Sequence, residues 1–283
     1  MKTLSSIILS ILLVISGCNI TKRRSYIVLF DNSISIPYYV VQRNIRTIQE
    51  TILPNIGPKD KLTLQFIDAC SQGQAERIYS FDLAEIDFTS KADGANHQAD
   101  SAKARMKRYI MGKVRDEIAT AILTKRMERN SCGSFTDIIH ALTEAVKLVE
   151  NKKSFTNSTD KLLNEANGDE NYQYETSIIL ISDMINENRE GTFNFTTFGR
   201  ISEGQVTQKL SMLKDANKIP DLRDVKIFVH GATASPGAGL LAGKEMDNVK
   251  FFWQHYFELT GAELKAYGYD SEKEIKDYQK EGI

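Results

Sequence analysis

The stretch SYIVLFDNSISIP, residues 25–37, decides the fold of this chain. Its apolar run YIVLF is typical of a strand that is buried on both faces of a parallel sheet. The run stops at Asp31, and two hydroxyl residues, Ser33 and Ser35, follow before Pro37, a residue type that is common in the first turn of a helix. A strand, a short polar loop and a helix in this order predict a β-α unit whose polar loop lies at the carboxyl end of the strand.

The same alternation of strands and helices continues along the 283-residue chain. Hydrophobic spacing predicts strands over 26–30, 61–67, 77–83, 176–184, 225–231 and 262–268. The third is expected at a sheet edge, and the last is expected to be a short strand or a turn. Amphipathic spacing predicts helices over 38–53, 98–129, 133–150, 204–217 and 247–261. This order indicates an α/β fold, with a doubly wound, mostly parallel sheet flanked by helices in a single domain.

The domain is expected to span 26–268, with insertions at about 85–130 and 151–174. A polar helix or tail is expected to follow over 269–283. Hydrophobic residues make up 41% of the chain, which is normal for a globular protein with a full core. The net charge of -1 gives no global attraction to nucleic acid, so no nucleic-acid partner is expected.

The amino-terminal residues have the pattern of an export signal. The stretch LSSIILSILLVI is apolar but too short to span a bilayer comfortably. It ends in ISGC, which resembles the lipobox of bacterial lipoproteins and implies cleavage before Cys18 and lipidation of its thiol; an ordinary signal peptide is the alternative. Residues 1–17 are then a lipoprotein signal peptide, and 18–25 are the lipidated cysteine and a short basic tether. Asn19 favours attachment to the outer membrane of the bacterial cell envelope, and the periplasmic face and the outer surface are the two alternatives.

Export also changes how the other two cysteines are interpreted. A disulfide can persist outside the cytoplasm, so Cys70 and Cys132 are a possible bridge that would restrain the loop before Thr136. The alternative is two buried free thiols, which behave as small hydrophobic residues.

Five oxygen-bearing side chains follow predicted strands or precede predicted helices: Asp31, Ser33, Ser35, Thr136 and Asp183. In doubly wound sheets, ligands bind at the carboxyl ends of the strands near the point where the strand order reverses. Each residue taken singly could be a helix cap or a turn residue. Together they offer hydroxyl and carboxylate oxygens, which are the ligands that Mg²⁺ prefers.

The segments DNSIS, GSFTD and LISD, in this order, resemble the metal-ion-dependent adhesion site of von Willebrand factor A domains. The resemblance covers about 25–267. It implies that Ser33, Ser35 and Thr136 contact a Mg²⁺ ion (or Mn²⁺ or Ca²⁺) through their hydroxyls, and that Asp31 and Asp183 act mostly through water. An Asp or Glu side chain of an unknown partner protein would fill the sixth position. This sequence departs from the family pattern in its long charged helix and in the GSFTD segment, where the family often has paired glycines.

The resemblance implies a membrane-anchored binding module without catalysis, an adhesion or scaffold protein. One alternative is a structural envelope lipoprotein in which the metal only stabilises the fold. A less favoured one is a metal-dependent hydrolase or phosphatase. Phosphatases of the haloacid dehalogenase type need a second acid two residues after the first, and Ser33 stands at that position after Asp31.

The loop after Asp183 carries Phe193, Phe195 and Phe198, with Arg189 nearby. Aromatic residues and arginine are the usual energetic centres of protein interfaces. These side chains are therefore a possible partner-contact rim, and the alternative is that the aromatic rings fold back onto the core.

Overall fold

The computed structural model describes residues 21–57, 60–67, 77–82, 96–128, 136–155, 172–187, 194–195, 202–232 and 244–281. Its centre is a six-stranded sheet with the order β3-β2-β1-β4-β5-β6. The strands are β1 (Thr21–Asp31), β2 (Lys61–Ile67), β3 (Arg77–Asp82), β4 (Tyr172–Ile181), β5 (Lys226–His230) and β6 (Glu263–Gly268). Every pairing is parallel except that of β3, which lies antiparallel to β2 at the sheet edge. The predicted α/β fold with a mostly parallel sheet is confirmed.

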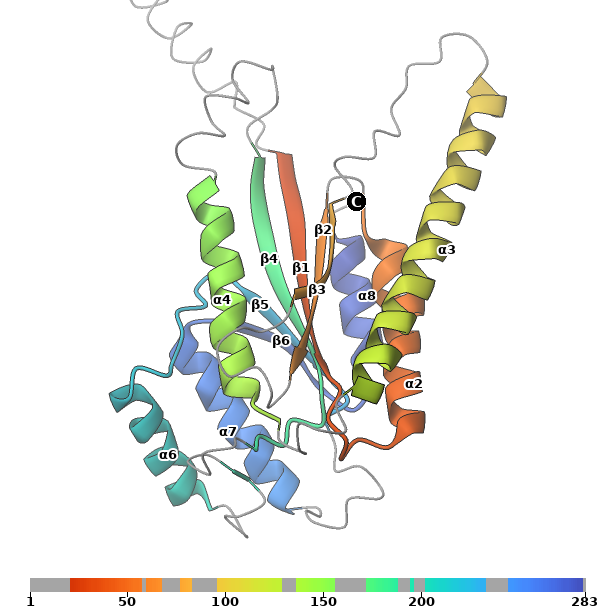
Figure 1. The fold of residues 1–283 in the computed structure, drawn as a ribbon. Helices are drawn as coiled ribbons and strands as arrows, with labels where there is room; N and C mark the ends of the chain where they lie inside the picture. Colours follow the sequence, from red (N-terminus) through yellow and green to blue (C-terminus); the bar gives the residue numbers. More distant parts are fainter. Residues whose placement is uncertain are drawn as a thin grey trace, which may run out of the picture.

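Helices cover both faces of the sheet (Figure 1). They are α2 (Tyr38–Thr47), α3 (Asn96–Glu128), α4 (Ile138–Phe155), α6 (Glu203–Asp215), α7 (Lys244–Thr260) and α8 (Glu272–Lys280). Helices α2, α3 and α8 pack on one face, and α4, α6 and α7 pack on the other. Within the described ranges, no helix is long and apolar enough to cross a bilayer.

The central strand explains why its sequence is continuously apolar. Ile27 and Leu29 belong to the core cluster under α4 and α7, whereas Tyr26, Val28 and Phe30 belong to the cluster under α2 and α3. All five side chains are fully buried. A strand covered on both faces has no solvent side, so it needs apolar residues at every position rather than at alternate ones.

Strand β1 is longer than the apolar pattern predicts. It begins at Thr21, so residues 21–25, predicted as a tether, are already part of the sheet. They pair in parallel register with the residues from Tyr172 to Thr176 of β4, which extends that strand into the predicted polar insertion. Main-chain hydrogen bonds form this part of the sheet, and they need extended partners rather than apolar side chains.

Two predicted helices also have different ends. The helix predicted over 38–53 ends as α2 at Thr47 and continues as a π-helical turn (Ile48–Ile52) and a 3₁₀ turn (Leu53–Asn55). The 3₁₀ turn contains Pro54, which lacks the backbone N–H that a continuing α-helix needs. Helix α4 continues to Phe155, five residues into the predicted insertion.

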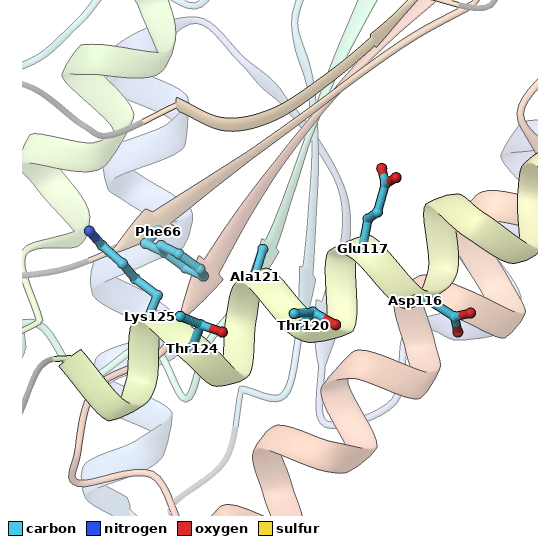
Figure 2. A pocket seen from close by; sticks show the side chains of 7 residues that line it. All are labelled: Phe66, Asp116, Glu117, Thr120, Ala121, Thr124 and Lys125. Carbon is cyan, nitrogen blue, oxygen red and sulfur yellow. The ribbon is translucent and has the colours of Figure 1, made fainter.

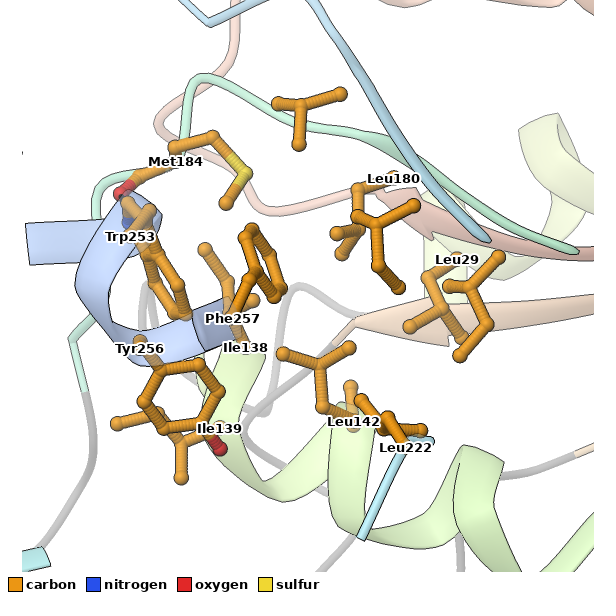
Figure 3. Packing of buried hydrophobic residues seen from close by; sticks show 14 of the residues in the cluster. Leu29, Ile138, Ile139, Leu142, Leu180, Met184, Leu222, Trp253, Tyr256 and Phe257 are labelled. Carbon is orange, nitrogen blue, oxygen red and sulfur yellow. Dashed lines mark hydrogen bonds between the residues drawn. The ribbon is translucent and has the colours of Figure 1, made fainter. Parts of the chain in front are cut away.

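Aromatic residues of α7 fill the core on the α4 side of the sheet. Figure 3 shows Trp253 and Phe257 among aliphatic residues of α4 and the central strands. Phe195 joins this group: its ring meets Phe252 edge-on at a centroid distance of 5.2 Å, and it is only 2% exposed. Of the two interpretations of this loop, packing onto the core holds for Phe195, and exposure at a rim does not. Its backbone N–H donates to the carbonyl of Asn186, which holds the ring against α7.

Replacing Phe195 by Ala should lower the free energy of unfolding by about 3–5 kcal/mol, because the substitution leaves a cavity beside Trp253. Chemical denaturation followed by circular dichroism measures the change. Met212→Ala, at a side chain that is 51% exposed, is the control and should change stability by less than about 0.5 kcal/mol. An unfolding curve of Phe195→Ala that matches the wild type would contradict the core placement.

Candidate functional site

The candidate site lies where the strand order reverses. Strands β1 and β4 are neighbours at the centre of the sheet, and the chain proceeds outward from them in both directions. Asp31 is the last residue of β1, and Asp183 follows the end of β4 by two residues. This is the position at which doubly wound sheets leave a crevice at the carboxyl ends of their strands.

The carboxylate of Asp31 is fully buried and held at both oxygens. Its Oδ1 accepts the backbone N–H of Ser33 at 2.9 Å, and its Oδ2 accepts the hydroxyl of Ser182 at 2.9 Å. The Ser182 Oγ also accepts the backbone N–H of Met184 at 3.0 Å. Ser182 stands directly before Asp183 in the LISD segment, and no local pattern in the sequence marks it as a partner of Asp31.

The two hydroxyls of the Asp-x-Ser-x-Ser loop lie together. The Oγ atoms of Ser33 and Ser35 are 2.9 Å apart, with Ser33 buried and Ser35 exposed. A backbone bond from the N–H of Ile36 to the carbonyl of Ser33 closes the loop at 3.2 Å. Two oxygen donors are thus presented side by side, next to the Asp31 carboxylate and open to solvent on one side.

Helix α3 holds this loop from the side. The guanidinium of Arg126 donates to the carbonyl oxygens of Ser33 at 3.0 Å and Ile36 at 2.6 Å. One turn earlier, the carbonyl of Ile122 accepts the side-chain N–H of Asn32 at 3.0 Å. Burial lowers the pKa of Arg126, and the negative charge of Asp31 opposes that shift. The long charged helix is therefore connected to the candidate site, which sequence reasoning did not anticipate.

Thr136 is brought to the same edge by a short bridge between loops. It is buried, and its backbone N–H and carbonyl exchange hydrogen bonds with Glu187 at 2.8 and 2.7 Å. The side chain of Asn186 accepts the N–H groups of Ile138 and Ile139, at 2.8 and 3.3 Å, at the start of α4. The Asn186 amide thus caps this helix, and the loop after β4 fixes the position of Thr136.

Asp183 is a half-buried acid close to a second acid. Burial is the main reason that its pKa rises to about 8, and the charge of Asp31 adds to the shift. The backbone N–H of Ile185 donates to its Oδ1 at 2.9 Å and partly offsets the rise. The next residue, Met184, has a φ of 67°, which is unusual for a residue with a side chain. Two carboxylates held this close favour a bound cation or a bound proton.

The structure thus gathers Asp31, Ser33, Ser35 and Asp183 at one sheet edge and connects Thr136 to it. In the described part of the chain, no group of three or more His, Cys, Asp or Glu side chains is placed to hold a metal ion. A metal at this edge would depend on the serine and threonine hydroxyls. Several predicted residues lie outside the described ranges: Cys18, Cys70, Cys132, Arg189, Phe193 and Phe198.

A separate hollow of about 460 Å³ lies between α3 and the end of β2 (Figure 2). Phe66 forms its floor, and Asp116, Glu117 and Lys125 are among the α3 residues that line it. Phe66 packs in the α2/α3 cluster, so the hollow lies on that face of the sheet. None of the five predicted metal ligands lines it.

Comparisons with known proteins give a distant structural similarity. No family model matches the chain, and no curated protein matches it. Among solved structures, the chain is similar to proximal thread matrix protein 1 (PTMP1) from the mussel byssus, with 14% sequence identity and a TM-score of 0.33. The match covers 94% of this chain and 48% of PTMP1, so the chain spans about half the length of that protein. The functional assignment therefore depends on the site itself.

The raised pKa of Asp183 predicts how stability depends on pH in the presence of a chelator. An unfolded Asp ionises near pH 3.9. Between that value and about 8, the folded protein binds more protons than the unfolded chain, so stability should fall as pH rises from 5 to 8. Thermal unfolding in EDTA measures this slope.

Asp183→Asn should flatten the slope, because the side chain no longer titrates. Asp215→Asn, at an exposed acid near the end of α6, is the control and should keep the wild-type slope. A slope that is unchanged in Asp183→Asn would contradict the placement of this acid beside Asp31.

Proposed function

We propose that this protein is a divalent-metal-dependent, non-catalytic protein-binding module with a site of the von Willebrand factor A type. The observation that carries the proposal is the pair of Ser33 and Ser35 hydroxyls, 2.9 Å apart, beside the buried carboxylate of Asp31 at the reversal of strand order. The parallel α/β fold is compatible with this family.

The side chains fit a hard cation. Ser33, Ser35 and Thr136 supply neutral hydroxyl oxygens, and Asp31 and Asp183 supply the negative charge that Mg²⁺, Mn²⁺ or Ca²⁺ requires. Burial and the charge of Asp31 both raise the pKa of Asp183, so a cation would relieve repulsion between the two acids. A bound ion would supply a positive charge that an Asp or Glu side chain of a partner protein can bind.

The chain's own residues would keep the donors in place. Ser182 and the Ser33 amide orient the Asp31 carboxylate, and Arg126 holds the backbone between Ser33 and Ile36. A rigid donor set lowers the entropy lost on binding. This arrangement supports a binding role better than the alternative of a structural lipoprotein, because Ser35 is exposed to solvent.

Titration calorimetry with Mg²⁺ and Mn²⁺ tests the metal site. Asp31→Asn and Ser33→Ala should weaken metal binding at least tenfold, about 1.4 kcal/mol, with an unchanged circular dichroism spectrum. Asp215→Asn should bind like the wild type. Equal affinity in all four proteins would refute the site. Partner capture from envelope extract is then compared in Mg²⁺ and in EDTA. If the metal raises the unfolding temperature but does not change this capture, the structural alternative is favoured.

The module is also proposed to be lipid-anchored at Cys18, in the bacterial cell envelope. The 11 residues of β1 span about 35 Å, so Asp31 lies at the opposite end of the strand from the proposed anchor. The candidate site would then face away from the membrane and toward a partner.

Cys18→Ser should move the exported protein from the detergent phase to the aqueous phase in a Triton X-114 partition, because an acyl chain provides the membrane affinity. Cys70→Ser is the matched control and should remain in the detergent phase. An unchanged partition of Cys18→Ser would reject the anchor and leave the metal site untouched.

A further inference from the structure

Large apolar side chains are exposed beside the candidate site. Of the eight that are exposed in the described part of the chain, three lie within six residues: Ile34 (42%), Tyr38 (52%) and Tyr39 (60%). A fourth, Tyr269 (49%), follows the carboxyl end of β6 at the same edge of the sheet. We call these four residues the tyrosine rim.

Arg43 lies next to the tyrosine rim. Arg43 lies one helical turn after Tyr39, and its guanidinium stacks over the ring of Tyr269 at 4.2 Å from the centroid. Burial lowers the pKa of Arg43, and the nearby acids Asp270 and Glu272 oppose that shift. The rim is therefore an aromatic surface with Arg43 beside it, and the charge of this arginine is balanced by the acids near it.

The backbone under the rim is fixed. The buried side chain of Ile36 anchors the loop, and Arg126 donates to the carbonyls on both sides of Ser35. The carbonyl of Pro37 accepts the N–H groups of Val40 and Val41 at 2.9 and 3.2 Å, which starts α2 directly after the loop. Aromatic residues held in this way provide contact area at low entropic cost, which is typical of interface centres.

The rim is also adjacent in the chain to the donors of the proposed site. Ile34 stands between Ser33 and Ser35, and Tyr38 and Tyr39 follow Ser35 by three and four residues. Because these residues directly flank the two serines, a segment whose carboxylate reaches the hydroxyls has exposed apolar side chains next to it. Exposed apolar area next to a polar centre is where burial adds affinity and selects the partner.

We infer that the tyrosine rim selects a protein segment in which an Asp or Glu is flanked by apolar or aromatic residues. The inference depends on the proposed function for the carboxylate and adds the chemistry of the flanking residues. The observation that carries it is the exposed Ile34, Tyr38 and Tyr39 side chains next to the Ser33 and Ser35 hydroxyls, because a segment that reaches these hydroxyls can bury its apolar residues there. The tyrosine rim is distinct from the phenylalanine rim considered in the sequence, whose one described member, Phe195, is in the core.

Three synthetic peptides test the inference. In acetyl-GGGEGGG-amide the glutamate has glycine neighbours, and in acetyl-GGLEFGG-amide it has leucine and phenylalanine. Binding to the full-length protein in Mg²⁺, followed by nuclear magnetic resonance titration, should be about tenfold tighter for the second peptide, because two apolar side chains are buried. The third peptide, acetyl-GGLQFGG-amide, should lose that binding because it lacks the carboxylate.

The variant Ile34→Ser/Tyr38→Ser/Tyr39→Ser should bind Mg²⁺ like the wild type and bind the first two peptides equally. The single variant Tyr39→Ser, which changes less surface, should lose part of the preference. The matched control Tyr109→Ser/Met212→Ser removes two exposed apolar side chains elsewhere and should keep the full preference.

The outcomes separate the two proposals. If Mg²⁺ binds but neither glutamate peptide binds the wild type, the proposed function fails and the inference fails with it. If the wild type binds both peptides equally, or the triple variant keeps the preference, the inference fails while the proposed function stands. If the glutamine peptide acetyl-GGLQFGG-amide binds as tightly as acetyl-GGLEFGG-amide, the inference is overturned. The same holds if the wild type forms a dimer that the triple variant does not form, because a second copy of the chain would then occupy the rim.

Discussion

The buried carboxylate of Asp31 is the constraint on which the rest of the site depends. A charge removed from water is costly unless strong hydrogen bonds compensate it, and each such bond contributes about 1.5–3 kcal/mol. The two partners of Asp31 come from different places: the Ser33 amide from its own loop, and the Ser182 hydroxyl from the end of β4. The carboxylate therefore joins the two central strands at the point where the strand order reverses, and the hydroxyl pair of the loop takes its position from that bond.

Both layers of helices contribute to this edge. From one layer, Arg126 and the Ile122 carbonyl of α3 hold the loop that follows β1. From the other layer, the indole N–H of Trp253 in α7 donates to the Met184 carbonyl at 2.9 Å, beside Asp183 (Figure 3). The loops of the site are thus tied to helices on opposite faces of one sheet. A shift of either helix layer would change the donor positions, which connects the packing of the core to the geometry of the site.

The loop after β4 contains a strained backbone conformation at Met184. Met184 adopts a left-handed backbone conformation, which costs of order 1 kcal/mol or more for a residue with a side chain. Its buried side chain and the bond from Trp253 keep it there. The turn lets Asp183 remain at the strand end while Asn186 and Glu187 reach the start of α4 and Thr136. Strain of this kind is common at binding sites, where the surrounding fold determines the local conformation.

The sequence by itself determined which segments enter the sheet and where its polar edge lies. Continuous apolar runs identify doubly buried strands, and the position of Asp31, Ser33 and Ser35 directly after one of them places these residues at the carboxyl edge. Both signals are local, so they are visible without a structure. Periodicity alone likewise predicted the long helix α3, which the structure has as Asn96–Glu128.

Only the tertiary structure decided which residues support the site and which aromatic side chains are exposed. The hydrogen bond between Ser182 and Asp31 joins residues 151 positions apart, and that between Arg126 and Ser33 joins residues 93 positions apart. Contacts over such separations leave no local pattern in a single sequence. Phe195 has polar neighbours in the sequence, yet its ring packs against Phe252 of α7 in the core. Tyr38 and Tyr39 have apolar neighbours in the sequence, yet they are exposed to solvent at the start of α2. Burial depends on what packs against a side chain, and that is set by elements distant in the chain.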